Sequence, residues 1–302
     1  ITCVEACPAD YVKSLDYGKF NTVFGRSKHQ TCIEKTEGTL TAWGASTHGG
    51  SGAPSGSFVN VFSNEWAFAA LKADGTINAW GDSSYGGSGA PSGSFVTVFS
   101  TASAFAALKA DGTINVWGDS SNGGSGAPSG SFVSVFSAKY AFAALKADGT
   151  INAWGSSSYG GSGAPSGSFV NIFSTNSAFA ALKADGTINA WGDSSYGGID
   201  EPSGSFVNVF STGYAFAALK ADGTINAWGA STHGGKDAPS GSFVNVFSTT
   251  AAFVAISKFC PPGTKADGIC KECAAGRYQD QTTESSCKEC AAGRFSIAGA
   301  SA

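Results

Sequence analysis

One motif recurs along this chain at a fixed step, and it constrains the fold more than any other feature. A Trp-Gly pair returns every 37 residues, at Trp43, Trp80, Trp117, Trp154, Trp191 and Trp228. An Asp-Gly pair keeps the same step, at Asp74, Asp111, Asp148, Asp185 and Asp222. A period of about 20 to 50 residues is typical of solenoids, propellers and other repeat arrays. The sequence therefore predicts one supersecondary unit that is repeated along the chain.

A single copy, residues 58–94, predicts three antiparallel strands. The first, FVNVFS (58–63), is rich in Phe and Val, which favour strands. The next two, AFAALKA (67–73) and TINAW (76–80), flank an Asp-Gly pair, which supplies the positive φ that a tight hairpin needs. The segment 81–94 is mainly Gly, Ser, Ala and Pro and must carry the chain back to the next copy. We expect it to be irregular or to hold only a very short strand.

Both sides of these strands are apolar or small, which favours sheets that pack face to face. The alanines at 67, 69, 70 and 79 would let neighbouring sheets approach closely. A ring of such sheets is a β-propeller, which leaves only short and protected strand edges. A β-helix is the alternative, but its coils are usually parallel and need no hairpin in every copy.

The repeat resembles that of the regulator of chromosome condensation family. The segment AFAALKADGTINAWGDSSYGG (67–87) matches the family's Ala-Leu, Asp-Gly, Trp-Gly and following Gly positions, and the first copy keeps a histidine, His29. The resemblance covers about residues 20–259 and implies an all-β, seven-bladed β-propeller. The copies here are shorter and lack the Gln-Leu-Gly that follows Trp-Gly in the family, so a regular fourth strand is not expected.

The two ends of the array are incomplete. The first copy, residues 20–44, is degenerate, and the seventh begins at Phe243 but has neither Asp-Gly nor Trp-Gly. The chain therefore contains seven copies of the first strand but only six of the strand that ends in Trp-Gly. We expect a strand at residues 10–15, within an N-terminal segment 1–19, to close the blade built from 243–259. The alternative is a six-bladed ring with an incomplete end.

Residues 260–302 change in character and contain Cys-x-x-Gly three times. They resemble ephrin-receptor-like cysteine-rich repeats, which are extracellular and disulfide-bonded. This resemblance implies a small disulfide-rich C-terminal extension with the pairs Cys260–Cys270 and Cys273–Cys287. Near-zinc-ribbon spacing, from Cys270 to Cys290, is the alternative. Zinc would leave Cys260 unused and would not explain the glycines three residues after each loop-opening cysteine, at Gly263, Gly276 and Gly293.

Two cysteines have no partner in this scheme. Cys290 opens a module that stops before its closing cysteine, which indicates that the extension is truncated. At the other end we expect Cys7 to pair with Cys32, which leaves Cys3 alone. Because free thiols are uncommon in oxidising compartments, we expect onward linkage through Cys3 and Cys290, in a longer polypeptide or an assembly. A bond between these two cysteines is the alternative.

The composition and motifs favour a protein without catalysis. Charged residues make up 13% of the chain and the net charge is −4, so there is no basic footprint for nucleic acid. The three histidines are His29, His48 and His233, and the last two share one position in glycine-rich crossings. No nucleophile–base spacing and no phosphate loop accompanies them. We expect no enzyme activity, no metal, no cofactor, and no transmembrane helix.

One position in the repeat varies while its surroundings are nearly constant. Between the first and second strands the copies read NEW (64–66), TAS, AKY (138–140), TNS, TGY (212–214) and TTA. These triplets predict a row of loops opposite the Asp-Gly tips. Trp66, Tyr140 and Tyr214 are then candidate aromatic anchors for a partner or a sugar. The alternative is a turn that tolerates many residues.

Together these features favour a secreted or cell-surface structural or adhesive protein, one segment of a larger surface or fibre-forming assembly. Its partners would be other copies of itself or other modules of a longer chain. A glycan-binding propeller that uses the variable triplets is the alternative. A nucleotide-exchange factor, as in the namesake of the repeat family, is disfavoured by the missing basic arm and the cysteine-rich flanks.

Overall fold

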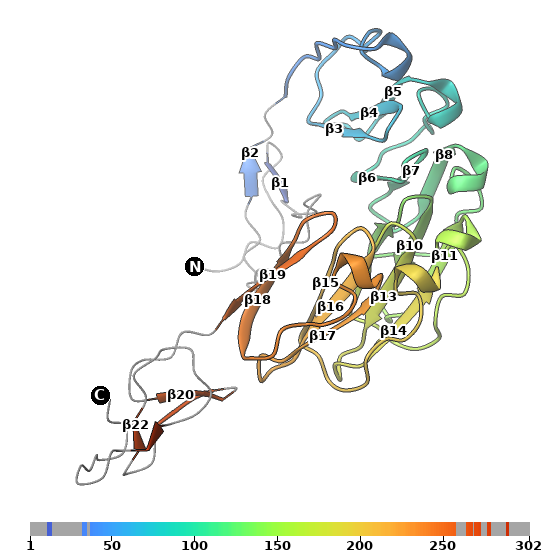
Figure 1. Cartoon of the computed structure of the whole chain (residues 1–302). Coiled ribbons are helices and arrows are strands. Elements are labelled where there is room, and N and C mark those ends of the chain that lie inside the picture. The colour runs from blue at the N-terminus through green and yellow to red at the C-terminus, as the bar shows by residue number, and fades with distance from the viewer. Residues whose placement is uncertain are drawn as a thin grey trace. The chain divides into compact units, whose positions relative to one another are not determined.

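The structure is a computed structural model of the 302-residue chain. It describes residues 37–257 and the backbone of six short strands outside that range. These strands are β1 (Tyr11–Lys13), β2 (Cys32–Glu34), β20 (Thr264–Asp267), β21 (Ile269–Glu272), β22 (Arg277–Tyr278) and β23 (Lys288–Glu289). The chain divides into two compact units, residues 1–164 and 165–302. Figure 1 labels many of the elements of the two units.

Each regular repeat forms a three-stranded antiparallel sheet whose second strand lies in the middle. The first unit holds β3 (Asn60–Ser63), β4 (Ala67–Leu71) and β5 (Ile77–Gly81), then β6 (Thr97–Ser100), β7 (Ala104–Leu108) and β8 (Ile114–Gly118), then β9 (Ser134–Ser137), β10 (Ala141–Leu145) and β11 (Ile151–Gly155). The second unit holds β12 (Asn171–Ser174), β13 (Ala178–Leu182) and β14 (Ile188–Gly192), then β15 (Asn208–Ser211), β16 (Ala215–Leu219) and β17 (Ile225–Gly229). The three strands predicted for one copy are thus confirmed.

The Asp-Gly hairpin forms as the sequence predicts. Leu71 lies opposite Ile77, and the backbone N–H of Gly75 donates to the carbonyl of Lys72 over 2.9 Å. Gly75 has a φ of 85°, and the Asp74 carboxylate accepts from the backbone N–H of Thr76 at 2.9 Å. The hairpin tip and the variable triplet 64–66 lie at opposite ends of β4, as the meander requires.

The crossing segments contain a short 3-10 helix in place of a fourth strand. In the crossing after β5 this is η2 (Ser83–Tyr85), where Asp82 accepts from the backbone N–H of Ser84 at 2.8 Å. The left-handed Gly86, with a φ of 93°, ends the helix. The equivalent helices are η1 (Ser46–His48), η3 (Ser120–Asn122), η4 (Ser157–Tyr159), η5 (Ser194–Tyr196) and η6 (Ser231–His233). This agrees with the expected irregular crossing.

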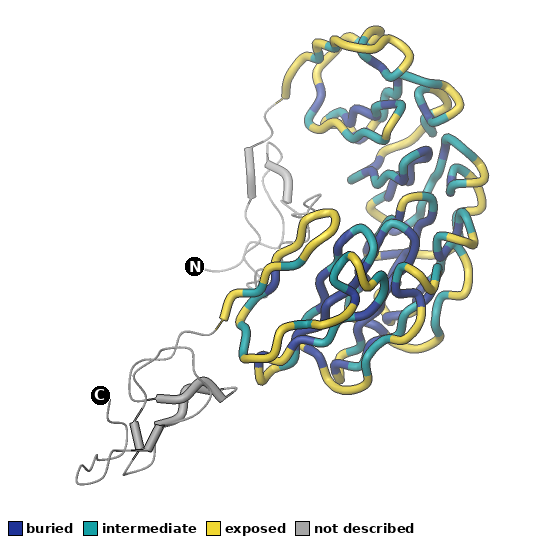
Figure 2. The backbone as a smooth tube through the Cα atoms, in the orientation of Figure 1, coloured by how far each residue is buried: buried dark blue, intermediate teal, exposed yellow. Residues whose placement is uncertain are grey.

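Within each unit, neighbouring sheets pack face to face. We call the side of a sheet that carries Ala67, Ala69 and Leu71, or their equivalents, the forward face. It packs against the rear face of the next sheet, which in β6–β8 carries Phe95, Val98, Phe105 and Trp117. The same arrangement joins β6–β8 to β9–β11, β12–β14 to β15–β17, and β15–β17 to β18–β19. The small alanines permit this close approach, and Figure 2 shows the buried strands in dark blue.

The fold is therefore all-β, with three-stranded sheets that recur every 37 residues, and it is consistent with a β-propeller. Among the described residues, no helix is long and apolar enough to cross a membrane.

The last repeat has two strands, β18 (Phe243–Ser248) and β19 (Phe253–Ser257), as its missing Trp-Gly predicts. A strand does form within the expected segment 10–15. Tyr11–Lys13 pairs antiparallel with Cys32–Glu34, the second strand of the first copy, with Val12 opposite Ile33. The expected pairing of this strand with the last repeat stays a prediction.

Candidate functional site

Within each unit, the middle residue of one variable triplet hydrogen-bonds to the middle residue of the next. In the first unit the backbone N–H of Glu65 donates to the carbonyl of Ala102 at 3.3 Å, and that of Ala102 donates to Lys139 at 2.8 Å. In the second unit the N–H of Asn176 donates to Gly213 at 2.9 Å, and that of Gly213 donates to Thr250 at 2.8 Å. The triplets therefore tie successive repeats together through the backbone.

The first position of a triplet organises its turn. The Thr101 hydroxyl accepts from the backbone N–H of Ser103 at 3.3 Å and of Ala104 at 3.0 Å, and it donates to the carbonyl of Asn122 at 3.1 Å. Asn64 has the same role in its turn. Its side-chain oxygen accepts from the backbone N–H of Ala67, and its side-chain nitrogen donates to the carbonyl of Tyr85 in the crossing. Thr175, Thr212 and Thr249 occupy the equivalent position. Five of the six copies carry a short side chain here that can accept and donate, and Ala138 is the exception.

The third position holds the predicted aromatic anchors, and these pack against rings of the crossing segments. The Trp66 ring lies between His48 and Tyr85, with centroid separations of 4.3 and 5.2 Å. Tyr214 lies in the same way between Tyr196 and His233, at 5.3 and 4.2 Å. We call these two groups, His48–Trp66–Tyr85 and Tyr196–Tyr214–His233, the three-ring stacks.

Tyr140 stands apart from the other two anchors. Its ring meets Tyr159 edge-on at 4.8 Å, and the position that would supply a ring on its other side is Asn122. The Lys139 ammonium lies 5.2 Å from the centroid of the Tyr140 ring. Tyr140 is thus the one predicted anchor without a second aromatic partner among the described residues.

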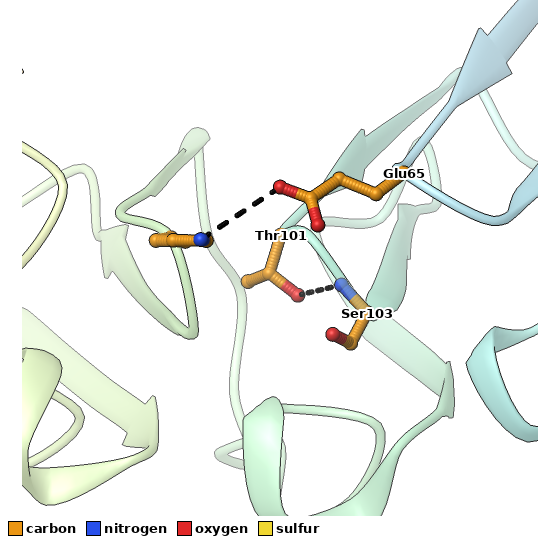
Figure 3. Close-up of polar contacts among 4 residues, drawn as sticks. Glu65, Thr101 and Ser103 are labelled. Atoms are coloured by element: carbon orange, nitrogen blue, oxygen red, sulfur yellow. Dashed lines mark hydrogen bonds and ion pairs between the residues drawn. The ribbon is translucent and has the colours of Figure 1, made fainter.

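Charged groups on the triplet row are sparse. Glu65 and Lys139 form an ion pair with an N–O distance of 3.9 Å, and their side chains are 53% and 40% exposed. Such an exposed pair contributes at most about 1 kcal/mol. Figure 3 shows the Glu65 carboxylate in this pair, beside the Thr101 hydroxyl that accepts from Ser103.

The sequence analysis found the anchors but missed their partners. It singled out Trp66, Tyr140 and Tyr214, and it noted the shared position of His48 and His233 without relating it to these anchors. The structure places His48 and His233 against two of these anchors. A signal was present in the sequence, because each anchor lies 18 residues after one crossing ring position and 19 before the next.

The stacks limit what this surface can bind. A sugar that docks on an aromatic side chain needs a free ring face, and neighbouring rings lie on both sides of Trp66 and of Tyr214. Within residues 37–257 no group of three or more His, Cys, Asp or Glu side chains could hold a metal ion. Two of the three predicted anchors are therefore already engaged in ring contacts within the protein.

The predicted cysteine sites fall largely outside the described part of the chain. Cys32 lies in β2 and Cys270 in β21, whose backbones are described. The others, Cys3, Cys7, Cys260, Cys273, Cys287 and Cys290, lie outside the described residues. The predicted pairings and the onward linkage stay predictions.

Comparison with known proteins finds similarity at the level of structure. The ectodomain of the receptor kinase CR4 from Physcomitrella patens matches with 18% identity and a TM-score of 0.46, over 81% of this chain and 80% of that one. The CRINKLY WD40 ectodomain of the Arabidopsis thaliana receptor kinase ACR4 matches with 16% identity and a TM-score of 0.44, over 73% and 82%. Prp20p from Saccharomyces cerevisiae matches with 15% identity and a TM-score of 0.41, over 57% and 58%.

These matches are to β-propeller domains of the regulator of chromosome condensation and CRINKLY types. At such TM-scores the similarity is partial and does not bear on function. No protein-family model matches the sequence, and no curated protein matches it.

Proposed function

We propose that this chain is a non-catalytic structural or adhesive protein, secreted or displayed at a cell surface as one segment of a larger assembly. The observation that carries the proposal is that, within each unit, the same contacts join one repeat to the next. The Trp117 indole N–H, for example, donates to the carbonyl of Gly86 at 2.9 Å, in the crossing that follows the preceding sheet. Near-identical repeats joined by near-identical contacts suit a durable building block.

The finer architecture belongs to the same proposal. The seven copies would form the seven blades of a β-propeller, followed by the disulfide-rich modules of residues 260–302. The five regular copies each supply a complete three-stranded sheet. The last copy becomes a complete blade only if a third strand is added to β18–β19.

Glycan binding is the alternative, and the stacks weaken its case because they occupy the rings of Trp66 and Tyr214. Tyr140 keeps a face without a ring partner. A glycan array therefore separates the two functions, with the variant Tyr140→Ser as the matched control. No glycan binding is expected. Binding that Tyr140→Ser abolishes would favour the alternative.

The structural role is tested on native material. Antibodies against the full chain should label filaments or a continuous layer at the cell surface in electron microscopy, before the cells are permeabilised. Labelling that appears only after permeabilisation would overturn the proposal.

A further inference from the structure

Two serines follow the proline of each crossing, and their hydroxyls differ in what they contact. In the crossing after β5 they are Ser92 and Ser94, and both are exposed. The Ser94 hydroxyl donates to the backbone carbonyl of Asp74 at 2.8 Å, so it ties the crossing to the preceding hairpin tip. The same bond recurs in other copies, at Ser131, Ser205 and Ser242. The fold therefore uses the second serine of the pair.

The first serine of the pair makes no hydrogen bond within residues 37–257, yet every crossing keeps it. Four crossings read GGSGAPSGS, and the other two read GGIDEPSGS (197–205) and GGKDAPSGS (234–242). The residues before the proline vary, whereas Pro-Ser-Gly-Ser does not. The glycine is required by its φ of 124° to 140°, and the second serine by its bond. We call the first serines the post-proline serines: Ser55, Ser92, Ser129, Ser166, Ser203 and Ser240, all of them exposed.

The chain around a post-proline serine is open. Three residues before Ser92, a Cβ on Gly89 would meet nothing within 4 Å. One residue after it, a Cβ on Gly93 would first meet the flexible end of the Lys109 side chain, at 3.5 Å. Pro91 favours an extended conformation in the residue before it. The Ser92 hydroxyl thus lies on an irregular surface segment with room for an added group.

The surroundings favour a sugar over a phosphate as that group. Protein kinases recognise patterns of charged residues near the acceptor, and residues 83–94 contain no charged side chain. Segments rich in serine with proline are instead typical of O-glycosylation. The sequence contains no Asn-x-Ser/Thr acceptor, so an attached sugar would have to be O-linked.

The surface also lacks the charge that usually keeps a protein hydrated. Charged residues make up 13% of this chain, whereas a typical soluble domain has about 25%. Apolar side chains are exposed close to the post-proline serines, since Val96, four residues after Ser92, is 50% exposed and its equivalent Val133 is also 50% exposed. Sugars are bulky and solubilising, and at these positions they would supply a hydrophilic cover.

We propose that the post-proline serines are acceptors for O-linked sugars, one in each crossing. The serine Oγ attacks the anomeric carbon of a sugar carried by a glycosyl phosphate donor. The bond between that carbon and Oγ forms, while its bond to the donor's phosphate oxygen breaks and leaves the electron pair on the phosphate. The hydroxyl proton passes to a base of the transferase. Because Ser94 holds its crossing at the tip residue Asp74, the sugars lie beside the Asp-Gly tips, away from the variable triplets.

The test is site mapping by mass spectrometry on the full chain purified from its natural source. Trypsin cuts after lysine, so peptides 73–109, 110–139, 147–183 and 184–220 each contain one whole crossing. Electron-transfer fragmentation leaves attached groups on their side chains. Each peptide should carry a sugar on its post-proline serine. The matched controls, two residues further on, should be unmodified: Ser94, Ser131, Ser168 and Ser205.

Peptides without a sugar overturn the inference, and so does a phosphate on the post-proline serine. A sugar on Ser94 or its equivalents in place of the post-proline serines also overturns it. Surface labelling, which tests the proposed function, reads where the chain is located and not what it carries. An unmodified chain that still labels the cell surface therefore contradicts this inference alone.

Two variants, expressed as the full chain in cells of the same source, separate the serines by their roles. Ser92→Ala should remove the sugar from peptide 73–109 and leave the other three peptides modified. It should not lower the thermal stability, because the hydroxyl has no partner within residues 37–257. Ser94→Ala should keep the sugar on Ser92 but lower the melting temperature, because the Asp74 carbonyl loses its donor. A sugar that stays on peptide 73–109 in Ser92→Ala contradicts the assignment.

Discussion

The indole nitrogen of Trp80 donates to the backbone carbonyl of Gly49, 31 residues earlier in the chain, over 2.9 Å. The same bond joins Trp117 to Gly86 and Trp154 to Gly123. It attaches the third strand of one repeat to the crossing that precedes that repeat, so the Trp-Gly and Gly-Gly motifs recur together because they bind each other.

We predict that this bond contributes strongly to stability. Trp117 is 5% exposed and stacks on Phe105 at 5.0 Å. Trp117→Phe keeps a ring but leaves the Gly86 carbonyl without its donor, which should cost about 1–3 kcal/mol of unfolding free energy. Trp117→Ala should cost more, about 3–5 kcal/mol. Urea denaturation of the chain measures both, and a Trp117→Phe variant as stable as the parent would show that the hydrogen bond is unimportant.

The hairpin tips should not accept a side chain. Gly112 has a φ of 86°, and a Cβ there would lie 2.7 Å from the backbone nitrogen of Phe132. Gly126 has a similar φ of 75°, but a Cβ there would meet nothing within 4 Å. Gly126→Ala should therefore cost only the backbone strain, about 1–2 kcal/mol, and Gly112→Ala clearly more. Melting temperatures of the two variants test this, and equal shifts would contradict the close packing at the tip.

The five tip aspartates should make stability depend on pH. Hydrogen bonds from the backbone and side chain of the following threonine lower the pKa of each carboxyl below its ordinary value, at Asp74, Asp111, Asp148, Asp185 and Asp222. A depressed pKa in the folded state stabilises the fold above the ordinary aspartate pKa of about 4, and the contribution is lost as pH falls through the folded pKa. The melting temperature should therefore fall below about pH 4.

Asparagine at all five tips is the control for this effect, because it keeps an acceptor oxygen but does not titrate. The variant should show a flatter melting temperature between pH 5 and pH 2, within about the range of the aspartate titration. Carboxyl titration by NMR should place the five pKa values below the ordinary one. An unchanged pH dependence in the variant would mean that other carboxyls dominate.

The three-ring stacks should stabilise the triplet row by a modest amount. Trp66→Ser introduces the residue that the next copy carries at this position, Ser103, and removes two ring contacts. Each aromatic pair is worth about 0.5–1.5 kcal/mol beyond area burial, so a loss of about 1–3 kcal/mol is expected. Tyr140→Ser removes one edge-on contact and should cost less. The reverse order in chemical denaturation would contradict the role assigned to the stacks.

The pairings Cys260–Cys270 and Cys273–Cys287 are predicted from the resemblance of residues 260–302 to disulfide-bonded modules, whereas Cys7–Cys32 is expected to tie the N-terminal segment to the first copy. Peptide mapping without reduction should recover Cys7–Cys32, Cys260–Cys270 and Cys273–Cys287. The zinc alternative makes the opposite prediction, namely four free thiols from Cys270 to Cys290 and one zinc ion per chain by elemental analysis.

The sequence alone determined the repeating sheet, and the reason is that its signals are local. Phe and Val are concentrated in runs of five or six residues that favour strands, and Asp74-Gly75 fixes a turn through its own backbone geometry. Such features act between residues a few positions apart. The same local sequence recurs every 37 residues, so the same three-stranded sheet is expected in each regular copy.

Only the tertiary structure decided what the variable and terminal residues contact. Trp66 meets His48 and Tyr85 because sheet packing brings two crossings to either side of its turn. Tyr11–Lys13 pairs with Cys32–Glu34, and strand propensity alone does not specify that partner. Such contacts depend on which segments of the chain the fold brings together, and no signal between residues a few positions apart specifies them.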